Sequence, residues 1–252
     1  MSLRIAAATD VGLRREHNED CYSNWTSSDP AELARRGELL IVADGMGGSA
    51  AGEVASRTAV DTVIRQFRDS HEDPDLALRH AVEEAHRTVY RMGREKAELA
   101  GMGTTCTAIS VKGRELRFAH VGDTRAYLVR NGHIRQLTAD HSLVAQLVQQ
   151  HLMTPEQARL DPRRNVLTRS IGVGESVEVD HGAQATELAP GDTVLLCTDG
   201  LHGLVSDEEL AQITGQPDLE KACAECVALA RQRGGYDNIT VMLARLGPEA
   251  GA

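Results

Sequence analysis

Three short apolar runs in this chain each carry an aspartate beside one end. The aspartates and their runs are Asp44 directly after residues 39–43, Asp199 two residues after 194–197, and Asp237 two residues before 239–243. A buried strand that ends in a carboxylate and a glycine, as at Asp44, places the carboxylate at a rim where the backbone can approach a ligand closely. The pattern predicts that three strand ends bring three aspartates together as a cage for hard cations.

Aspartates that cluster without histidine or cysteine favour Mg²⁺ or Mn²⁺, because these ions prefer oxygen ligands and tolerate water in the remaining positions. Two such ions about 4 Å apart share a bridging water, lower its pKa and clamp an in-line displacement at phosphorus. A guanidinium is the natural partner for the phosphate, and residues 12–20 hold arginines beside carboxylates. These residue types favour a metal-dependent phosphoester hydrolase. The alternative is that each Asp-Gly is an ordinary turn and that 12–20 is a solvated one.

Residues 45–50, Gly-Met-Gly-Gly-Ser-Ala, also match the dinucleotide-binding pattern G-x-G-x-x-A after a strand and before a helix. Two features count against that function. Asp44 would lie beside the incoming pyrophosphate, and the next two segments are helical in pattern, where a βαβ unit requires a second parallel strand. Covalent phosphatase chemistry is disfavoured as well, because the sequence has no C-x5-R spacing, no D-x-D motif at a strand end and no G-x-S-x-G elbow.

Composition excludes several other classes. A length of 252 residues fits one large domain or two small ones, and a formal net charge of -10 argues against nucleic acid or an anionic membrane as the main partner. No apolar run approaches the ~20 residues of a membrane span, and the N-terminus lacks the apolar core of a signal peptide, so we expect a cytoplasmic protein. Five scattered cysteines do not suggest a disulfide framework, and we interpret Cys223 and Cys226 as packing residues of one helix face.

The elements that must position the aspartates follow from periodicity and from turn and cap signals. Strands are expected at residues 3–9, 20–25, 39–43, 104–111, 115–121, 125–130, 133–137, 177–185, 192–198 and 239–245. Helices are expected at 49–67, from the Asp73-Pro74 cap to Met92, at 142–150, after caps at Thr154 and Ser206, and at 219–232. The Asn131-Gly132 pair predicts an antiparallel hairpin. Many antiparallel strands with helices in pairs between them indicate a layered α+β domain.

Residues 140–172 interrupt the strand pattern with a polar excursion. A segment of this size and polarity is more typical of a flap over a site than of a core. Just before it, residues 121–125 present another aspartate, Asp123, at a turn. Taken alone, Asp123 is best interpreted as part of an ordinary Gly-Asp turn.

Taken together, the motifs resemble the type 2C, or PPM, family of metal-dependent protein serine/threonine phosphatases in its bacterial form. The matching segments are 15–20, 42–48, 103–105, 121–125, 137–142, 164–169, 197–200 and 237–240. They occur in the order of the family and span nearly the whole chain. The resemblance implies an α+β fold with a central antiparallel β-sandwich flanked by helices on both outer faces, in four layers α-β-β-α. It also implies one catalytic domain over residues 1–252, with residues 140–172 as a flap near the metal site.

The resemblance assigns the metal ligands as well. Asp44 would bridge two Mn²⁺ or Mg²⁺ ions, and the carbonyl oxygen of Gly45 would bind one of them. Asp199 and Asp237 would hold the other ion. Asp123, together with Asp199, corresponds to a third metal position in bacterial members, so its interpretation as a mere turn loses ground. Two or three Mn²⁺ or Mg²⁺ ions are therefore the expected cofactors.

Three further residues receive roles from the resemblance. Glu19 and Asp20 would orient metal-bound waters, and Arg15 would grip the substrate phosphate. Met46 stands where many animal members carry a histidine assigned as the general acid, so the proton donor is not identified.

The implied reaction is hydrolysis of phosphoserine and phosphothreonine in proteins by direct attack of a metal-bridging hydroxide. The expected partners are phosphorylated proteins, including a bacterial Ser/Thr kinase and its targets, with no nucleic acid and no membrane, and the expected state is a monomer. The alternative on the same fold is a catalytically silent phosphoprotein-binding module. Loss of a metal aspartate would favour that alternative, and none is lost.

Overall fold

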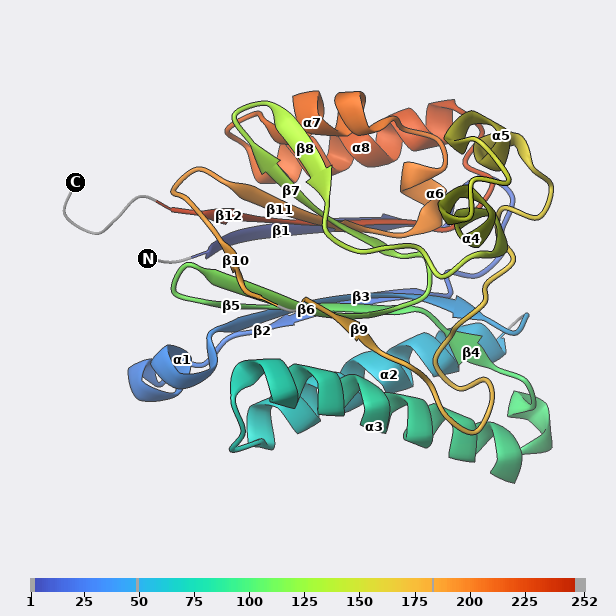
Figure 1. The fold of residues 1–252 in the computed structure, drawn as a ribbon, viewed down its shortest axis with the longest axis horizontal. Coiled ribbons are helices and arrows are strands. Elements are labelled where there is room, and N and C mark those ends of the chain that lie inside the picture. Colours follow the sequence, from blue (N-terminus) through green and yellow to red (C-terminus); the bar gives the residue numbers. More distant parts are fainter. Residues whose placement is uncertain (1–2, 49, 183, 248–252) are drawn as a thin grey trace.

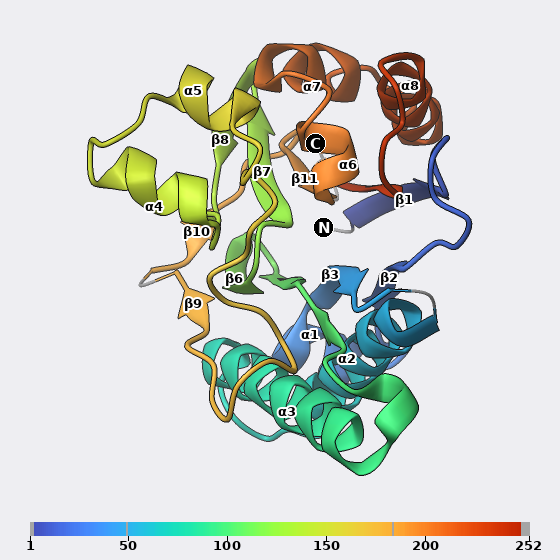
Figure 2. The ribbon, with the colours of Figure 1, turned by 90° about the vertical axis from the view of Figure 1, so that its right-hand side faces the viewer.

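The computed structural model describes residues 3–48, 50–182 and 184–247. Two antiparallel sheets lie face to face, and a layer of helices covers the outer face of each (Figure 1). Seen from the end, the layers follow one another as helices, sheet, sheet and helices (Figure 2). The predicted α+β sandwich with helices on both outer faces is confirmed. No helix within the described ranges is long and apolar enough to cross a membrane.

Neighbouring strands pair antiparallel in both sheets. The first sheet has five strands in the order β1-β12-β11-β7-β8. Its strands are β1 (Leu3–Asp10), β7 (Arg125–Arg130), β8 (His133–Gln136), β11 (Thr193–Cys197) and β12 (Ile239–Leu246). The second sheet has seven strands, in the order β10-β6-β5-β3-β2 with β4 beside β3 and β9 beside β6. Its strands are β2 (Asp20–Trp25), β3 (Glu38–Met46), β4 (Gly103–Thr104), β5 (Cys106–Lys112), β6 (Glu115–Val121), β9 (Asp180–His181) and β10 (Thr186–Glu187).

Strand β3 shows why the apolar runs are continuous rather than alternating. Leu39 and Ile41 pack in the apolar cluster on the helix side, while Leu40 and Val42 pack in the cluster between the sheets. Successive side chains of a strand leave on opposite faces, so a strand covered on both faces is apolar throughout. β11 and β12 divide their side chains in the same way between the inter-sheet cluster and the helices on their own side.

Two helices cover each sheet (Figure 1). They are α2 (Ala50–Asp69) and α3 (Pro74–Glu95) on the second sheet, and α7 (Asp207–Thr214) and α8 (Leu219–Gln232) on the first. The shorter helices are α1 (Pro30–Arg36), η1 (Ala97–Leu99), α4 (Leu143–Gln149), α5 (Pro155–Leu160) and α6 (Asp199–His202). Cys223 and Cys226 are free thiols buried in the apolar cluster under α8, which confirms their interpretation as packing residues.

The predicted turn and cap signals act as expected. The Asp73 side chain accepts a hydrogen bond from the Asp75 N–H at the start of α3, and Thr154 forms the capping box of α5. Asn131 and Gly132 have φ values of 52° and 77°, the left-handed pair that a two-residue hairpin requires. β7 and β8 pair on either side of this turn.

The prediction of one strand at residues 177–185 is wrong. The structure has two strands of two residues there, β9 and β10, on the outer edge of β6. β9 pairs His181 with Ala119, whereas β10 pairs Thr186 with Leu116, so the second pairing lies two residues out of step with the first. The chain therefore pairs with this edge at two separate places and forms no continuous ladder. Residue 183, between them, lies outside the described residues.

Candidate active site

Asp44 lies on the face of β3 that carries Leu40 and Val42, so its side chain points between the two sheets. Asp20 of β2 is its direct cross-strand partner, and such partners point to the same face. Thr105 fixes the backbone here. Its Oγ1 accepts a 2.8 Å hydrogen bond from the Asp44 N–H, and its own N–H donates to the Asp44 carbonyl at 2.9 Å. Two carboxylates are thereby held side by side at one end of the sandwich.

The Asp20 carboxylate links the two sheets. Its Oδ2 accepts hydrogen bonds from Thr198 Oγ1 at 2.9 Å and from Thr240 Oγ1 at 2.6 Å. In the opposite sheet, Thr198 directly follows β11 and Thr240 belongs to β12. Its Oδ1 is buried and has no hydrogen-bond partner among the residues that the structure describes. Burial raises the pKa of Asp20 to about 7, although the two hydroxyls act in the opposite direction.

Asp199 is the first residue of α6, and Asp237 stands two residues before β12. The two segments approach very closely, because a Cβ on Gly200 would lie 1.9 Å from the Asn238 carbonyl oxygen. Only glycine fits at that position. Within the described part of the chain, Asp199 Oδ1 is buried without a hydrogen-bond partner. Burial, reinforced by the negative charge of Asp237, raises the pKa of Asp199 to about 6.

Arg15 reaches the same region from the loop between β1 and β2. Its Nη2 donates a 2.7 Å hydrogen bond to Asp237 Oδ2, and the guanidinium is half exposed. Asn238 fixes this loop to β12. Its side-chain oxygen accepts a hydrogen bond from the Glu19 N–H at 2.8 Å, and its amide nitrogen donates to two carbonyls of the loop at 3.0 and 2.9 Å. The predicted phosphate-binding arginine is thus held beside a predicted metal ligand.

Glu19 and Gly45 meet at the start of α2. The Glu19 carbonyl accepts hydrogen bonds from the Gly45 N–H at 3.1 Å and from Ser56 Oγ at 2.7 Å. A Cβ on Gly45 would lie 2.2 Å from the Gly52 carbonyl oxygen, so this glycine permits the close approach of strand and helix. Glu19 Oε1 is buried without a hydrogen-bond partner in the described ranges, and burial raises the pKa of this carboxyl.

Asp123 lies in the turn between β6 and β7, and two histidines that the sequence analysis did not assign hold this turn. His202 Nε2 lies 3.0 Å from the Asp123 carbonyl oxygen. His141 Nδ1 accepts a 3.1 Å hydrogen bond from the Gly122 N–H, and its Nε2 lies 3.1 Å from Asp180 Oδ2. Burial raises the pKa of Asp123 well above its usual value, and the charge of Asp199 adds to the effect. The one sequence signal for His141 was its place in the matching segment 137–142.

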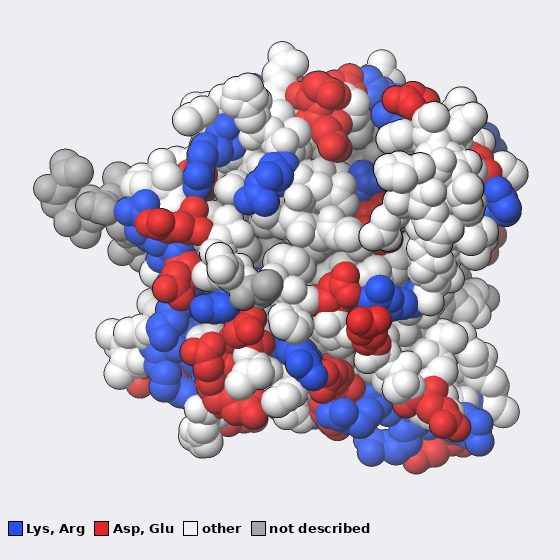
Figure 3. Space-filling model, viewed as in Figure 1, with Lys and Arg blue, Asp and Glu red and all other residues white. Residues whose placement is uncertain are grey.

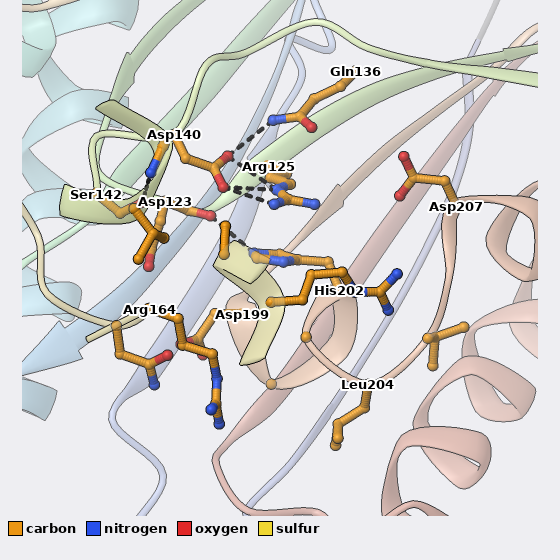
Figure 4. Close-up of a pocket in the computed structure, with 18 of the residues that line it drawn as sticks. Asp123, Arg125, Gln136, Asp140, Ser142, Arg164, Asp199, His202, Leu204 and Asp207 are labelled. Atoms are coloured by element: carbon orange, nitrogen blue, oxygen red, sulfur yellow. Dashed lines mark hydrogen bonds and ion pairs between the residues drawn. The ribbon is translucent and has the colours of Figure 1, made fainter. Parts of the chain in front are cut away.

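A pocket of about 830 Å³ opens beside Asp123, Asp199 and Asp237. Its other walls come from the flap helices α4 and α5, from α6 and from the start of α7. Figure 4 shows Arg125 and Asp140 joined at one edge of this pocket. The guanidinium donates hydrogen bonds of 2.7 to 3.1 Å to both oxygens of that carboxylate. The predicted flap therefore supplies part of the wall beside the acidic residues.

The acidic side chains suit hard cations. Burial raises the pKa of Asp44 well above its usual value, and the charges of Asp20, Asp199, Asp123 and Asp237 all add to the effect. Bound divalent cations would satisfy the unpartnered oxygens and displace the protons. No three His, Cys, Asp or Glu side chains in the described residues are gathered closely enough to form a complete metal-binding group. A sparse carboxylate set of this kind suits ions that keep several water ligands, as Mg²⁺ does.

Comparisons with known proteins place the chain in a family. The family model for protein phosphatase 2C matches residues 16–244. Protein phosphatase PhpP of Streptococcus pneumoniae is 34% identical over 253 residues, which cover 98% of this chain and 99% of that protein. The crystal structure of the Mycobacterium tuberculosis serine/threonine phosphatase PstP/Ppp is 36% identical, with a TM-score of 0.86 over 98% of this chain and 99% of that one.

A second solved structure adds a metal to the comparison. It is the catalytic domain of serine/threonine protein phosphatase PstP in complex with two manganese ions, 34% identical, with a TM-score of 0.82 over 98% of this chain and 99% of that one. The family model matches most of the chain, and the relatives align with it over nearly their whole length. This chain belongs to the protein phosphatase 2C family.

Proposed function

We propose that this chain is a metal-dependent protein phosphatase that hydrolyses phosphoserine and phosphothreonine in proteins, with two or three Mn²⁺ or Mg²⁺ ions as cofactors. The proposal rests on one observation. Five aspartates lie close enough at one end of the sandwich for the charges of four to raise the pKa of the fifth, Asp44. Two of their buried carboxylate oxygens have no hydrogen-bond partner in the described residues. Relatives that match along the whole chain are serine/threonine phosphatases, and one solved relative holds two manganese ions.

The proposed ligands come from both sheets. Asp44 and the Gly45 carbonyl oxygen would hold ions on the side of β3, and Asp199 and Asp237 would hold them on the side of β11 and β12. Asp123, with Asp199, would complete a further position. When bound, the ions supply a water of lowered pKa as nucleophile and neutralise the charge on the phosphate oxygens.

The remaining site residues bind phosphate and orient water in this proposal. Arg15 donates to Asp237 through Nη2, so the other N–H groups of the guanidinium remain available to phosphate oxygens. Glu19 Oε1 and Asp20 Oδ1 are buried acceptors without partners in the described residues, and in this proposal each would accept a hydrogen bond from an ordered water.

Hydrolysis of a phosphothreonine peptide by the purified protein tests the proposal. We expect no phosphate release with EDTA and full recovery once Mn²⁺ is restored. Asp44→Ala and Asp199→Ala should each lower kcat by at least about 100-fold at saturating Mn²⁺, because each removes a proposed ligand. Near-normal turnover in either variant would contradict the metal assignment. A folded protein without turnover under both conditions would favour the phosphoprotein-binding module.

The finer parts of the function are proposals as well. We propose that the substrates include a Ser/Thr kinase and its targets, that the enzyme is a cytoplasmic monomer, and that residues 1–252 act as one catalytic unit with 140–172 as the flap. The pairing of the first strand β1 with the last strand β12 supports the single unit. The face seen in Figure 3 carries acidic and basic residues side by side, which supports a partner other than nucleic acid. Light scattering on the purified protein tests the monomeric state.

A further inference from the structure

The pocket extends well beyond the residues proposed to act at phosphorus. In Figure 4 Asp123 and Asp199 lie on one side of it, and Asp207, the first residue of α7, lies across from them with His202 between. A volume of about 830 Å³ is within the range of pockets that enclose whole ligands, and it greatly exceeds the volume of one phosphate group. The pocket therefore has room for the residues that flank a phosphorylated side chain.

Aliphatic side chains form part of the wall between these two ends. The flap contributes Val144 and Val148 from α4 and Ala158 from α5. The segment between α6 and α7 contributes Leu204 and Val205. A ligand that crosses the pocket from the acidic site towards α7 can thus contact aliphatic side chains on the way, although Arg159 and Arg164 line the pocket as well.

Asp207 is an acid of the lining that lies outside the proposed metal ligands. Asp140, another acid outside the proposed metal ligands, is paired with Arg125. Asp237 is paired with Arg15, and Asp199 lies within the field of Arg164. Among the described residues, the Asp207 carboxylate has no ion pair and no hydrogen bond.

We propose that this pocket binds the segment beside the phosphorylated residue and selects substrates with a lysine or arginine there. The inference rests on the proposed phosphatase function. The aliphatic stem of such a side chain would lie along the apolar walls while its cationic head reaches Asp207. A long basic side chain can contact the aliphatic part of the wall with its stem and a carboxylate with its charged end. A glutamate at the same substrate position would be repelled.

Matched phosphothreonine peptides test this specificity. The peptides differ at one flanking position, which holds arginine, norleucine or glutamate, and the position is moved along both sides of the phosphothreonine. At one position we expect kcat/KM with arginine to exceed that with norleucine by about three- to tenfold, the range of a partly exposed charge pair. Glutamate at that position should lower kcat/KM.

Variants of Asp207 assign the preference to this residue. Asp207→Asn should bring the ratio of arginine to norleucine peptide close to one, Asp207→Glu should keep it, and Asp207→Lys should reverse it in favour of glutamate. Glu220→Gln is the matched control, because Glu220 is an exposed acid in the first turn of α8 and lies outside the pocket lining. It should leave the ratio unchanged.

Three results of these experiments would contradict the proposed specificity. A basic preference that survives Asp207→Asn, or its absence in the parent protein at every position, would overturn it. So would an equal loss of kcat/KM for the arginine and norleucine peptides in Asp207→Asn, since that loss would come from the fold or the acidic site. The small ester para-nitrophenyl phosphate separates the two proposals. If the Mn²⁺-loaded protein hydrolyses this ester and the norleucine peptide without a basic preference, only the specificity fails; if it hydrolyses neither, the proposed function fails.

Discussion

Arg15 and Asp237 form an ion pair beside the acidic site, with 2.7 Å between Arg15 Nη2 and Asp237 Oδ2. The arginine is half exposed, and ion pairs of this kind contribute only about 0–1 kcal/mol to stability. The pair can therefore open, or share its donors, at little energetic cost when phosphate arrives. Arg15 also contacts one of the proposed metal ligands, so the proposed phosphate site and the proposed metal site meet at these two side chains.

Substitution of Arg15 is expected to act mainly on phosphate binding. Arg15→Ala should raise the KM for para-nitrophenyl phosphate by about tenfold, because a charge-assisted hydrogen bond to a phosphate is worth about 1.5 kcal/mol or more. Arg15→Lys should fall between the two, since lysine keeps the charge but not the fork of donors. Arg14→Ala is the control, because Arg14 is exposed and does not line the pocket. An unchanged KM in Arg15→Ala would remove this residue from the phosphate site.

The sequence predicted the types of the site residues but not their contacts. Asp44 and Asp199 stand at the ends of apolar runs, which a reader of the sequence can see. The contact of Asp20 with Thr198 and Thr240 joins two sheets, and the contact of His202 with Asp123 joins two distant turns. Contacts of this kind depend on how the sheets stack, and no local spacing encodes that stacking.

At the scale of elements, the junction of β11, α6 and β12 is the tightest part of the site. β11 and β12 were predicted because both of their faces are buried, which makes their sequences apolar throughout. The strand predicted at 177–185 had the wrong bounds, because β9 and β10 each make only two pairings on an edge, too few to impose a pattern on the sequence. The loop that carries Asp199 depends instead on one glycine, Gly200, beside the backbone of Asn238.

Gly200→Ala is expected to disturb this junction. The added Cβ would lie 1.9 Å from a backbone oxygen, so the β11 and β12 ends must separate, at a cost of about 1–3 kcal/mol in the free energy of unfolding. Activity should fall with it, because Asp199 and Asp237 move apart. Gly215→Ala is the control, since its Cβ would meet no atom closer than 3.3 Å and its φ is -72°. Urea unfolding of both variants measures the difference, and equal stability would show that the junction can relax.

At the scale of the whole molecule, acidic groups at one end of the sandwich make its stability depend on pH and on cations. Burial raises the pKa of Asp20 to about 7 and that of Asp199 to about 6, while unfolded aspartate titrates near about 4. Between pH about 4 and pH about 7, the folded state therefore binds more protons than the unfolded state does. The contribution of these groups to stability is therefore present at low pH and is lost as the pH rises through about 6 to 7.

Thermal unfolding at two pH values tests this dependence. In EDTA we expect these carboxyls to lower the Tm between pH 5 and pH 8. Mn²⁺ should raise the Tm more at pH 8 than at pH 5, because at pH 8 the ions compete with fewer protons for the carboxylates. The variant Asp20→Asn, which has no charge to bury, should show a smaller pH dependence in EDTA. An equal Mn²⁺ effect at both pH values would contradict the pKa directions.

The pairing of β1 with β12 has a practical consequence for handling the protein. The two strands pair along their whole length, from Leu3 beside Leu246 to Asp10 beside Ile239. Asp237 lies two residues before Ile239, at the end of the pair where Asp10 stands. Figure 1 accordingly shows the start of β1 and the end of β12 on the side of the molecule away from α4, α5 and α6. A tether joined beyond either strand end is expected to leave from that side. Molecules anchored in this way on a sensor surface present the pocket to solution, so capture of phosphopeptides can be followed without the anchor masking it.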